Sequence, residues 1–331
     1  MKRVGDIFPR ILDWENFANA SWKAARGKRG KPATRMFLDN LHDNLNQLIA
    51  EVANGDYRTG PYTRFLIYDP KQRLIHAPCF RDRVLHHAVM NLCEPVFEKR
   101  LIFDTYACRL GKGHHAALRR AHGFSRTYPY FLKMDVRHFF DSVNHRVLIA
   151  QLWRIFKDRP LLNLFGRIIG DYQSKPGRGL PIGSHCSQHF ANSYLAPLDR
   201  LVKETLGLKG YVRYMDDFVV WHHDRDVLKL TRDRIVAFMN DALALQPKPS
   251  PFINRSALGL QFLGYRLFPG GLRLSKRGAR RFAEKSRHYR WLFETGGYTE
   301  AQYQQRCQAL VAATSLADCI SFRKLVLYGS R

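Results

Sequence analysis

The chain has 331 residues, of which 45% are hydrophobic and 13% aromatic, too many apolar side chains for a disordered protein. Lys and Arg number 54 against 28 Asp and Glu, which leaves a formal net charge of +26. Because such an excess destabilises a compact chain by self-repulsion, it favours a polyanionic partner over a merely soluble basic surface or a membrane surface.

The first part of the chain is predicted to be helical and then to form a strand pair. We expect two helices within residues 1–55, separated by a basic, glycine-containing loop at 23–35. Residues 62–69 and 73–75 predict two strands joined by a Pro-Lys-Gln turn. Apolar residues recur at helical spacing over 81–98, which predicts a helix there.

The later part of the chain contains apolar strands that are interrupted by aspartates. One such strand ends at Asp135, and residues 211–221 form a predicted hairpin with two aspartates between its strands. A helix is expected over 187–201, and a second hairpin over 261–274 that turns at Pro-Gly-Gly. From Ser275 onward the tail is predicted to be helical and is at first strongly basic.

Asp135, Asp216 and Asp217 are the candidate catalytic residues. An ionised carboxylate beside an apolar core is costly unless it is paired or binds a metal ion. Phosphoryl transfer with two metal ions needs carboxylates that converge from different strands. A lone Asp-Asp pair in a hairpin is usually only a turn, but Asp135 and the high positive charge favour nucleotide chemistry.

Several motifs resemble those of reverse transcriptases and occur in the same order. The Y-x-D-D motif of that family is matched by RYMDDFVV, and its metal-binding strand with the following helix by FLKMDVRHFFDSVNH. Its fingers motif is matched by RLIHAPCFRDRVLHHAV, and its primer-grip hairpin by QFLGYRL. In detail the chain is similar to the enzymes of diversity-generating retroelements, whose L-P-I-G-x-x-x-S-Q stretch stands at 180–188, and WENF at 14–17 also fits.

The resemblance implies a fold and an activity. The implied fold is α+β, a right-hand polymerase with an antiparallel palm sheet, fingers and a short helical thumb. We expect an N-terminal basic helical segment at 1–55, the fingers and palm at 56–274, and a basic helical thumb at 275–331. The implied activity is RNA-directed DNA synthesis from dNTPs by two-metal phosphoryl transfer, error-prone at template adenines.

The resemblance also implies site residues. The three aspartates are the implied ligands of two Mg²⁺ ions, which Mn²⁺ can replace, and Val136 belongs to the same metal site. The implied dNTP-binding residues are Lys71, Arg73, Phe140 and Ile182. The implied template and fidelity loop contains Pro181, Gly183, Ser187 and Gln188.

Two of these residues carry sharper expectations. Phe140 lies where the resemblance places the residue under the sugar of the incoming nucleotide, and a Phe ring excludes a 2′-hydroxyl, so the substrate should be dNTP. Phe139 is expected to point the other way, into the core. Ile182 stands where many accurate reverse transcriptases carry Gln, and losing that polar contact relaxes discrimination. Simple packing of Ile182 beneath the loop stays open.

Lys248 stands slightly before the usual place of a candidate proton donor to pyrophosphate.

The expected partners are an RNA template, a DNA or RNA primer and dNTPs. The resemblance adds a small, basic, oligomeric accessory protein. Six scattered cysteines and the lack of a long apolar run predict a cytoplasmic protein with no membrane partner.

Other classes remain open at this point. One alternative is a retron, group II intron-like or phage-defence reverse transcriptase, and another is a non-catalytic RNA-binding palm scaffold. The histidines, including the His86-His87 and His114-His115 pairs, are assigned to surface or core roles because no metal-binding spacing stands out.

Overall fold

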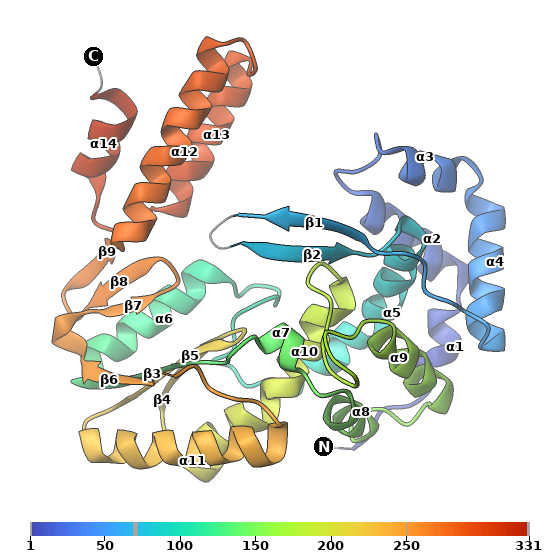
Figure 1. Cartoon of the computed structure of the whole chain (residues 1–331), viewed down its shortest axis with the longest axis horizontal. Helices are drawn as coiled ribbons and strands as arrows, with labels where there is room; N and C mark the ends of the chain where they lie inside the picture. The colour runs from blue at the N-terminus through green and yellow to red at the C-terminus, as the bar shows by residue number, and fades with distance from the viewer. Residues whose placement is uncertain (1, 69–71, 250, 330–331) are drawn as a thin grey trace. The chain divides into compact units, whose positions relative to one another are not determined.

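The protein is described by a computed structural model that covers the chain except for residues 1, 69–71, 250 and 330–331. The chain divides into two compact units that alternate along the sequence (Figure 1). Unit 1 contains Met1–Phe103, Asp135–Leu201 and Arg234–Pro249. Unit 2 contains Asp104–Met134, Val202–Asp233 and Ser250–Arg331.

The N-terminal part of unit 1 is helical. Its helices are α1 (Phe8–Ile11), α2 (Trp14–Ala25), α3 (Pro32–Asp39), α4 (Leu41–Asn54) and α5 (Phe80–Glu98). The prediction of only two helices before residue 55 was wrong, because a short helix α1 precedes α2 and a further helix, α3, begins inside the predicted loop. Pro32 begins α3, a position where its fixed φ and missing N–H are tolerated. The irregular basic segment is therefore shorter than predicted.

Two strands follow in unit 1, as predicted. Strand β1 (Thr63–Ile67) pairs antiparallel with β2 (Arg73–Ala77), with Ile67 opposite Arg73. Most of the predicted turn between them, including Lys71, lies outside the described residues.

The remaining helices of unit 1 include the buried helix α10. They are α7 (Phe139–Ser142), α8 (His145–Trp153), α9 (Arg159–Gly170) and α10 (His185–Arg200), and α11 (Arg225–Leu243) belongs in part to each unit. Helix α10 packs against α5 and α8 and is buried over most of its length, including Phe190 and Tyr194. It begins two residues earlier than predicted, which places His185 in its first turn.

Unit 2 is built on two sheets. The four-stranded sheet has the order β4-β5-β3-β6, with β3 (Tyr130–Asp135), β4 (Gly210–Tyr214), β5 (Asp217–His222) and β6 (Phe252–Arg255). Within it β4 pairs antiparallel with β5, and β3 with β6. The three-stranded sheet is an antiparallel meander of β7 (Leu260–Phe262), β8 (Tyr265–Phe268) and β9 (Gly271–Leu274).

The second predicted hairpin is thus a three-stranded meander. The expected turn after Phe268 is present, but a further turn separates β7 from β8. Leu263 and Gly264 form it with φ values of 48° and 83°, the positive pair typical of a tight two-residue hairpin. Sequence reasoning treated the segment from Gln261 as one strand because Leu263 is apolar and masks the turn.

The core of unit 2 joins these sheets to helix α6 (His114–Thr127). Ala117, Leu118 and Ala121 lie on one face of α6 and belong to the same buried cluster as Phe131 and Trp221. The Trp221 indole N–H donates to the Ser125 hydroxyl at 3.2 Å, so the buried ring keeps a polar partner.

The C-terminal part of unit 2 is helical, as predicted. Helix α12 (Lys276–Glu294) packs against α13 (Glu300–Ala313) and α14 (Ile320–Tyr328) (Figure 1). Helices with antiparallel sheets confirm the predicted α+β class, whereas the boundaries at residues 55 and 274 stay predictions. Among the helices that the structure describes, none combines the length and apolar character needed to cross a membrane.

Candidate active site

Asp216 and Asp217 lie at the tip of the β4–β5 hairpin. Tyr214 pairs with Asp217, so Met215 and Asp216 form a two-residue turn, and the predicted hairpin is confirmed. Met215 has a φ of 57°, a left-handed value that is unfavourable for a residue with a Cβ and recurs at functional sites. The buried Arg213 donates from Nη1 to the Met215 carbonyl oxygen at 2.9 Å, which stabilises this turn.

Lys133 lies beside Asp217 within unit 2. Its ammonium nitrogen is 3.3 Å from Oδ2 of Asp217 and donates to the Gln261 carbonyl oxygen at 2.8 Å. Because Lys133 is on β3 and Gln261 on β7, one cation connects the two sheets at this carboxylate. Sequence reasoning missed Lys133 and Arg213. The available signal was a cationic residue inside an otherwise apolar strand in both cases.

Asp135 and Lys248 lie together in unit 1. Lys248 forms an ion pair with Oδ2 of Asp135, and its backbone N–H donates to the Asp135 carbonyl oxygen at 2.9 Å. Val136 is buried and forms a bridge with Pro247, so residues 246–248 run along the chain that carries Asp135. Lys248 is therefore held at the carboxylate, although it stands slightly before the place in the sequence where the proton donor is expected.

The second oxygen of Asp135 bears on the predicted metal site. Oδ1 is buried, and within the described part of the chain it has no hydrogen-bond partner. A buried carboxylate oxygen without a donor is costly, and a bound cation removes that cost. The side chain of Asp135 thus fits a metal ligand.

Phe140 and the predicted fidelity loop adjoin in unit 1. The Leu180 N–H donates to the Phe140 carbonyl oxygen at 2.7 Å. The Phe139 side chain is 2% exposed, whereas Phe140 is half-buried, so the two rings differ in accessibility as the alternation predicts. Phe140 is the more accessible of the two.

The same loop is attached to strand β2. The His76 N–H donates to the Ile182 carbonyl oxygen at 2.8 Å. Gly183 has a φ of 119°, and a Cβ there would lie 2.8 Å from Cγ2 of Ile75, so the close approach requires glycine. Unit 1 therefore brings together the loop, the strand that begins with Arg73, and Phe140.

The other predicted site residues differ in accessibility. Arg73 is exposed and Ile182 is half-buried. Pro181 is buried, and Ser187 lies inside α10 with 2% of its surface exposed, while Gln188 is half-buried. Lys71 lies outside the described residues.

A cationic hollow lies on the surface of unit 1. It measures about 490 Å³ and is lined by Asn19, Trp22, Lys23, Arg26, Gly27 and Arg29. The Arg29 guanidinium lies over the Trp22 ring, 5.2 Å from its centroid. Cationic side chains next to an exposed aromatic ring are the elements that bind single-stranded nucleic acid.

Known proteins resemble this chain over about half of its length. Its similarity to the putative COX1/OXI3 intron 1 protein of Saccharomyces cerevisiae is 23% identity over 181 residues, 51% of this chain and 22% of that protein. Its similarity to the group II intron-encoded protein LtrA of Lactococcus lactis is 26% identity over 187 residues, 51% of this chain and 31% of that protein. The chain thus matches less than a third of either relative's length.

A solved structure of Candida albicans telomerase, determined with a fragment of telomeric RNA, is similar with a TM-score of 0.48 at 10% identity. The similarity covers 78% of this chain and 56% of that one.

The family of the chain follows from its central segment. Residues 68–267, more than half of the chain, match the family described as "Reverse transcriptase (RNA-dependent DNA polymerase)". This segment contains Asp135, the hairpin with Asp216 and Asp217, and the loop at 180–183. The chain belongs to the reverse transcriptase family.

Proposed function

We propose that this protein is an RNA-directed DNA polymerase that copies an RNA template into cDNA from dNTPs. The observation that carries the proposal is the carboxylate pair Asp216-Asp217 on a tight turn with a left-handed Met215, in a chain of the reverse transcriptase family. A scaffold that only binds RNA has no need for two adjacent carboxylates on an unfavourable turn, because their mutual repulsion lowers stability.

Asp135, Asp216 and Asp217 would hold two Mg²⁺ ions, with Val136 in the same site and Mn²⁺ as a substitute. The buried oxygen of Asp135 supports a bound cation, and the ammonium groups beside Asp135 and Asp217 indicate that both carboxylates attract positive charge. When bound, the ions supply activation of a 3′-hydroxyl and neutralisation of the triphosphate. The protein must hold the carboxylates in place. The backbone at 246–248 supports the segment that carries Asp135, and Arg213 supports the turn that carries Asp216.

The nucleotide would be bound by residues of unit 1. Phe140 would lie under the sugar, Ile182 near the nascent base pair, and Arg73, with Lys71, against the triphosphate. The contacts between the 180–183 loop, β2 and Phe140 support this assignment. The template side of the loop would comprise Pro181, Gly183, Ser187 and Gln188. Residues 56–274 would form fingers and palm, 275–331 the thumb, and 1–55 a basic extension.

Primer extension on poly(rA)/oligo(dT) with and without Mg²⁺ tests the activity. We expect Mg²⁺-dependent extension by the wild type and a loss of at least about a thousandfold in Asp216→Asn and Asp135→Asn, since each removes charge from the metal site. RNA binding by both variants should persist. Asp226→Asn, an exposed carboxylate on α11 that pairs with Lys229, is the matched control and should retain activity. Extension by Asp216→Asn at the wild-type rate contradicts the site, and RNA binding without extension by the wild type supports the scaffold.

We further propose that the enzyme belongs to a diversity-generating retroelement and miscopies template adenines. The L-P-I-G stretch supports this subtype, since it places the half-buried Ile182 on a loop bonded to Phe140 and β2. The proposal includes a template from the element itself and a small, basic, oligomeric accessory protein. Sequencing cDNA made from a defined RNA tests it, and errors concentrated opposite adenine are expected.

A second candidate is a group II intron-like reverse transcriptase. The similarity to intron-encoded proteins of Saccharomyces cerevisiae and Lactococcus lactis favours it. Uniformly low error opposite all four template bases would support this candidate over the retroelement subtype and leave the polymerase proposal intact.

A further inference from the structure

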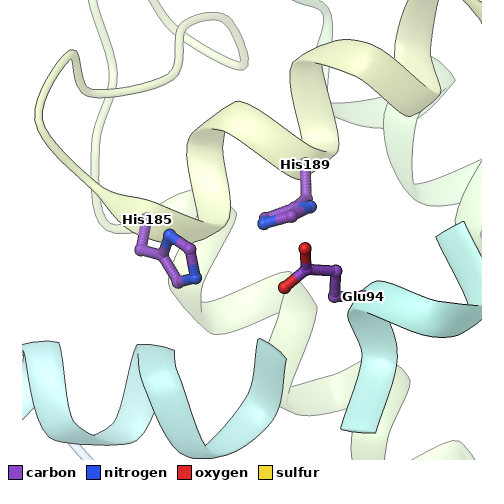
Figure 2. A group of neighbouring side chains, drawn as sticks. All are labelled: Glu94, His185 and His189. Carbon is purple, nitrogen blue, oxygen red and sulfur yellow. The ribbon is translucent and has the colours of Figure 1, made fainter. Parts of the chain in front are cut away.

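Three potential metal ligands converge from two helices of unit 1. Glu94 extends from α5, and His185 and His189 extend from α10, with the carboxylate of Glu94 directed toward the His189 ring (Figure 2). One ligand atom from each side chain lies within 4.8 Å of the other two. None of the three belongs to the proposed polymerase site. His185 and His189 were expected to have surface or core roles, so the sequence did not predict this cluster.

The spacing on α10 suits chelation. His185 and His189 are one helical turn apart, so their rings lie on the same face, 5.0 Å between centroids and nearly perpendicular at 89°. Two histidines at this spacing on one helix form half of a common zinc-binding arrangement. Because the carboxylate comes from another helix, the sequence shows only the His pair, and packing of α5 on α10 completes the set.

The protonation state of the histidines suits metal binding. Burial, with a contribution from His189 and Lys23, lowers the pKa of His185 to about 4. Burial likewise lowers the pKa of His189 to about 4, although Glu98 opposes the shift. Both imidazoles are therefore neutral at pH 7, and a neutral imidazole has the lone pair that a metal ion requires.

Neighbouring rings restrain both imidazoles. His87 stacks on His185 with 4.6 Å between centroids and 27° between planes. Phe97 lies parallel to His189 at 6.3 Å and 24°. Restrained ligands lose less entropy when they bind an ion, so this packing favours a built site over an accidental cluster.

We propose that Glu94, His185 and His189 bind a divalent transition-metal ion of the zinc class, with water as the fourth ligand, and so link α5 to α10. Two imidazole nitrogens and a carboxylate oxygen form a donor set that zinc uses in proteins. Tetrahedral ligands at zinc–ligand distances of 2.0–2.1 Å lie about 3.3 Å apart. The ligand atoms lie within 4.8 Å of one another, so the widest separation must shrink by at most about 1.5 Å. Rotation of the half-buried Glu94 side chain would shorten this separation while stacking holds the imidazoles in place.

The position of the site suggests its effect. His185 is the first residue of α10 and follows Gly183 and Ser184, at the end of the loop that carries Ile182. An ion bound to both helices would hold this end of the loop against α5. The binding itself does not depend on the proposed polymerase activity.

Direct metal binding by the untagged full chain is the test. After treatment with a chelator, the protein is titrated with Co²⁺ in excess Mg²⁺, followed by displacement with Zn²⁺. We expect one equivalent with the intense visible absorption of tetrahedral Co²⁺, and a higher Tm with Zn²⁺. Glu94→Gln, His185→Gln and His189→Gln should each weaken binding at least about tenfold, because each removes a ligand. Circular dichroism checks that every variant is folded.

Two variants serve as matched controls. His87→Gln removes a ring that stacks on His185 but is not among the three ligands, so stoichiometric binding should remain. Asp216→Asn should also retain the ion, which separates this site from the polymerase metal site. The proposal is overturned if folded wild-type protein binds no Co²⁺ or Zn²⁺ in excess Mg²⁺, if binding survives in Glu94→Gln unchanged, or if it is lost in Asp216→Asn. If a histidine variant fails to fold, Glu94→Gln alone decides, because Glu94 is half-buried at the surface.

Discussion

Phe139 and Phe140 are adjacent in sequence but differ in what they contact. The Phe139 side chain is buried, and the Phe140 side chain is half-buried. The backbone carbonyl oxygen of Phe140 accepts a hydrogen bond from the Leu180 N–H. If Phe140 is the sugar gate, Phe140→Ala removes a steric clash with the 2′-hydroxyl. We expect the ratio of dNTP to rNTP incorporation efficiency to fall at least about tenfold, with the metal dependence retained.

The neighbouring ring provides the control for that experiment. Phe139→Leu changes the shape of a buried side chain and should leave the nucleotide ratio unchanged. An unchanged ratio in folded Phe140→Ala would locate the gate elsewhere.

Ile182 tests the fidelity role of the loop. Gln at this position can form a hydrogen bond that penalises a badly placed nucleotide, whereas Ile offers only apolar contact. We expect Ile182→Gln to lower misincorporation opposite adenine by about ten- to a hundredfold, equivalent to about 1–3 kcal/mol. Error frequency is measured by sequencing cDNA from a defined RNA, with Ile182→Val as the apolar control. Equal error rates in the Gln and Val variants would assign Ile182 to packing.

Lys248 competes for the carboxylate that the metal requires. Its ammonium is paired with Asp135, and 42% of its side chain is exposed, so the pair contributes little to stability. We expect Lys248→Met to lower the Mg²⁺ concentration for half-maximal extension severalfold while kcat at saturating Mg²⁺ stays within about threefold. Lys229→Met, an exposed lysine that pairs with Asp226, is the control. A loss of about a hundredfold or more in kcat would instead indicate proton donation by Lys248.

At the scale of elements, α5 carries a buried histidine that links stability to pH. Burial, with contributions from His185 and His87, lowers the pKa of His86 to about 3, and its ring lies 3.3 Å from the Ser184 hydroxyl. The unfolded chain binds a proton near pH 6.5, so the folded state loses stability as pH falls below that value. The loss continues toward pH 3, by up to about 1.4 kcal/mol per pH unit.

Thermal or urea unfolding between pH 7 and 5, with a chelator present, measures this loss. His86→Gln should reduce the slope of stability against pH by the contribution of one histidine, because His185 and His189 also have a lowered pKa. His42→Gln on the surface of α4 should leave the slope unchanged. A wild-type stability that stays constant from pH 7 to 5 would contradict the buried, neutral state of His86.

Elements with strong local signals could be predicted, and those set by packing could not. The Asp-Asp hairpin, helix α5 and strand β3 were predicted because their periodicity is clear within each segment. The turn at Leu263-Gly264 was missed because the residues around it are apolar. Lys133 was missed as a neighbour of Asp217, and the pairing of Lys248 with Asp135 was not foreseen, because each pair is far apart in sequence. Arg213 was missed although it lies only two residues from the Met215 carbonyl that it contacts. Glu94 likewise meets His185 and His189 only after α5 packs on α10.

At the scale of the molecule, the net charge of +26 should control template affinity. The segment at 23–35 has six exposed Lys and Arg side chains, and α12 begins with further exposed ones. Each phosphate contact with a single strand contributes about −0.7 to the slope of log affinity against log salt, so we expect a slope of about −4 or steeper.

Filter binding or fluorescence anisotropy between low and moderate salt measures this slope. Replacing Arg26 and Arg29 by Gln should reduce its magnitude by about 1.4, whereas Arg232→Gln on α11 should have a smaller effect. A flat titration would mean that these charges face something other than nucleic acid.

The alternation of the two units along the sequence has a consequence for synthesis on the ribosome. Unit 1 starts with Met1–Phe103 but needs residues up to Pro249, so 249 − 103 = 146 further residues must be made before it is complete. At about 5–20 residues per second, roughly seven to thirty seconds pass between the synthesis of the N-terminal helices and the completion of unit 1. Until α10 is made, the face of α5 that packs on it is uncovered, so chaperone dependence during translation should exceed that of a protein whose domains are consecutive in sequence.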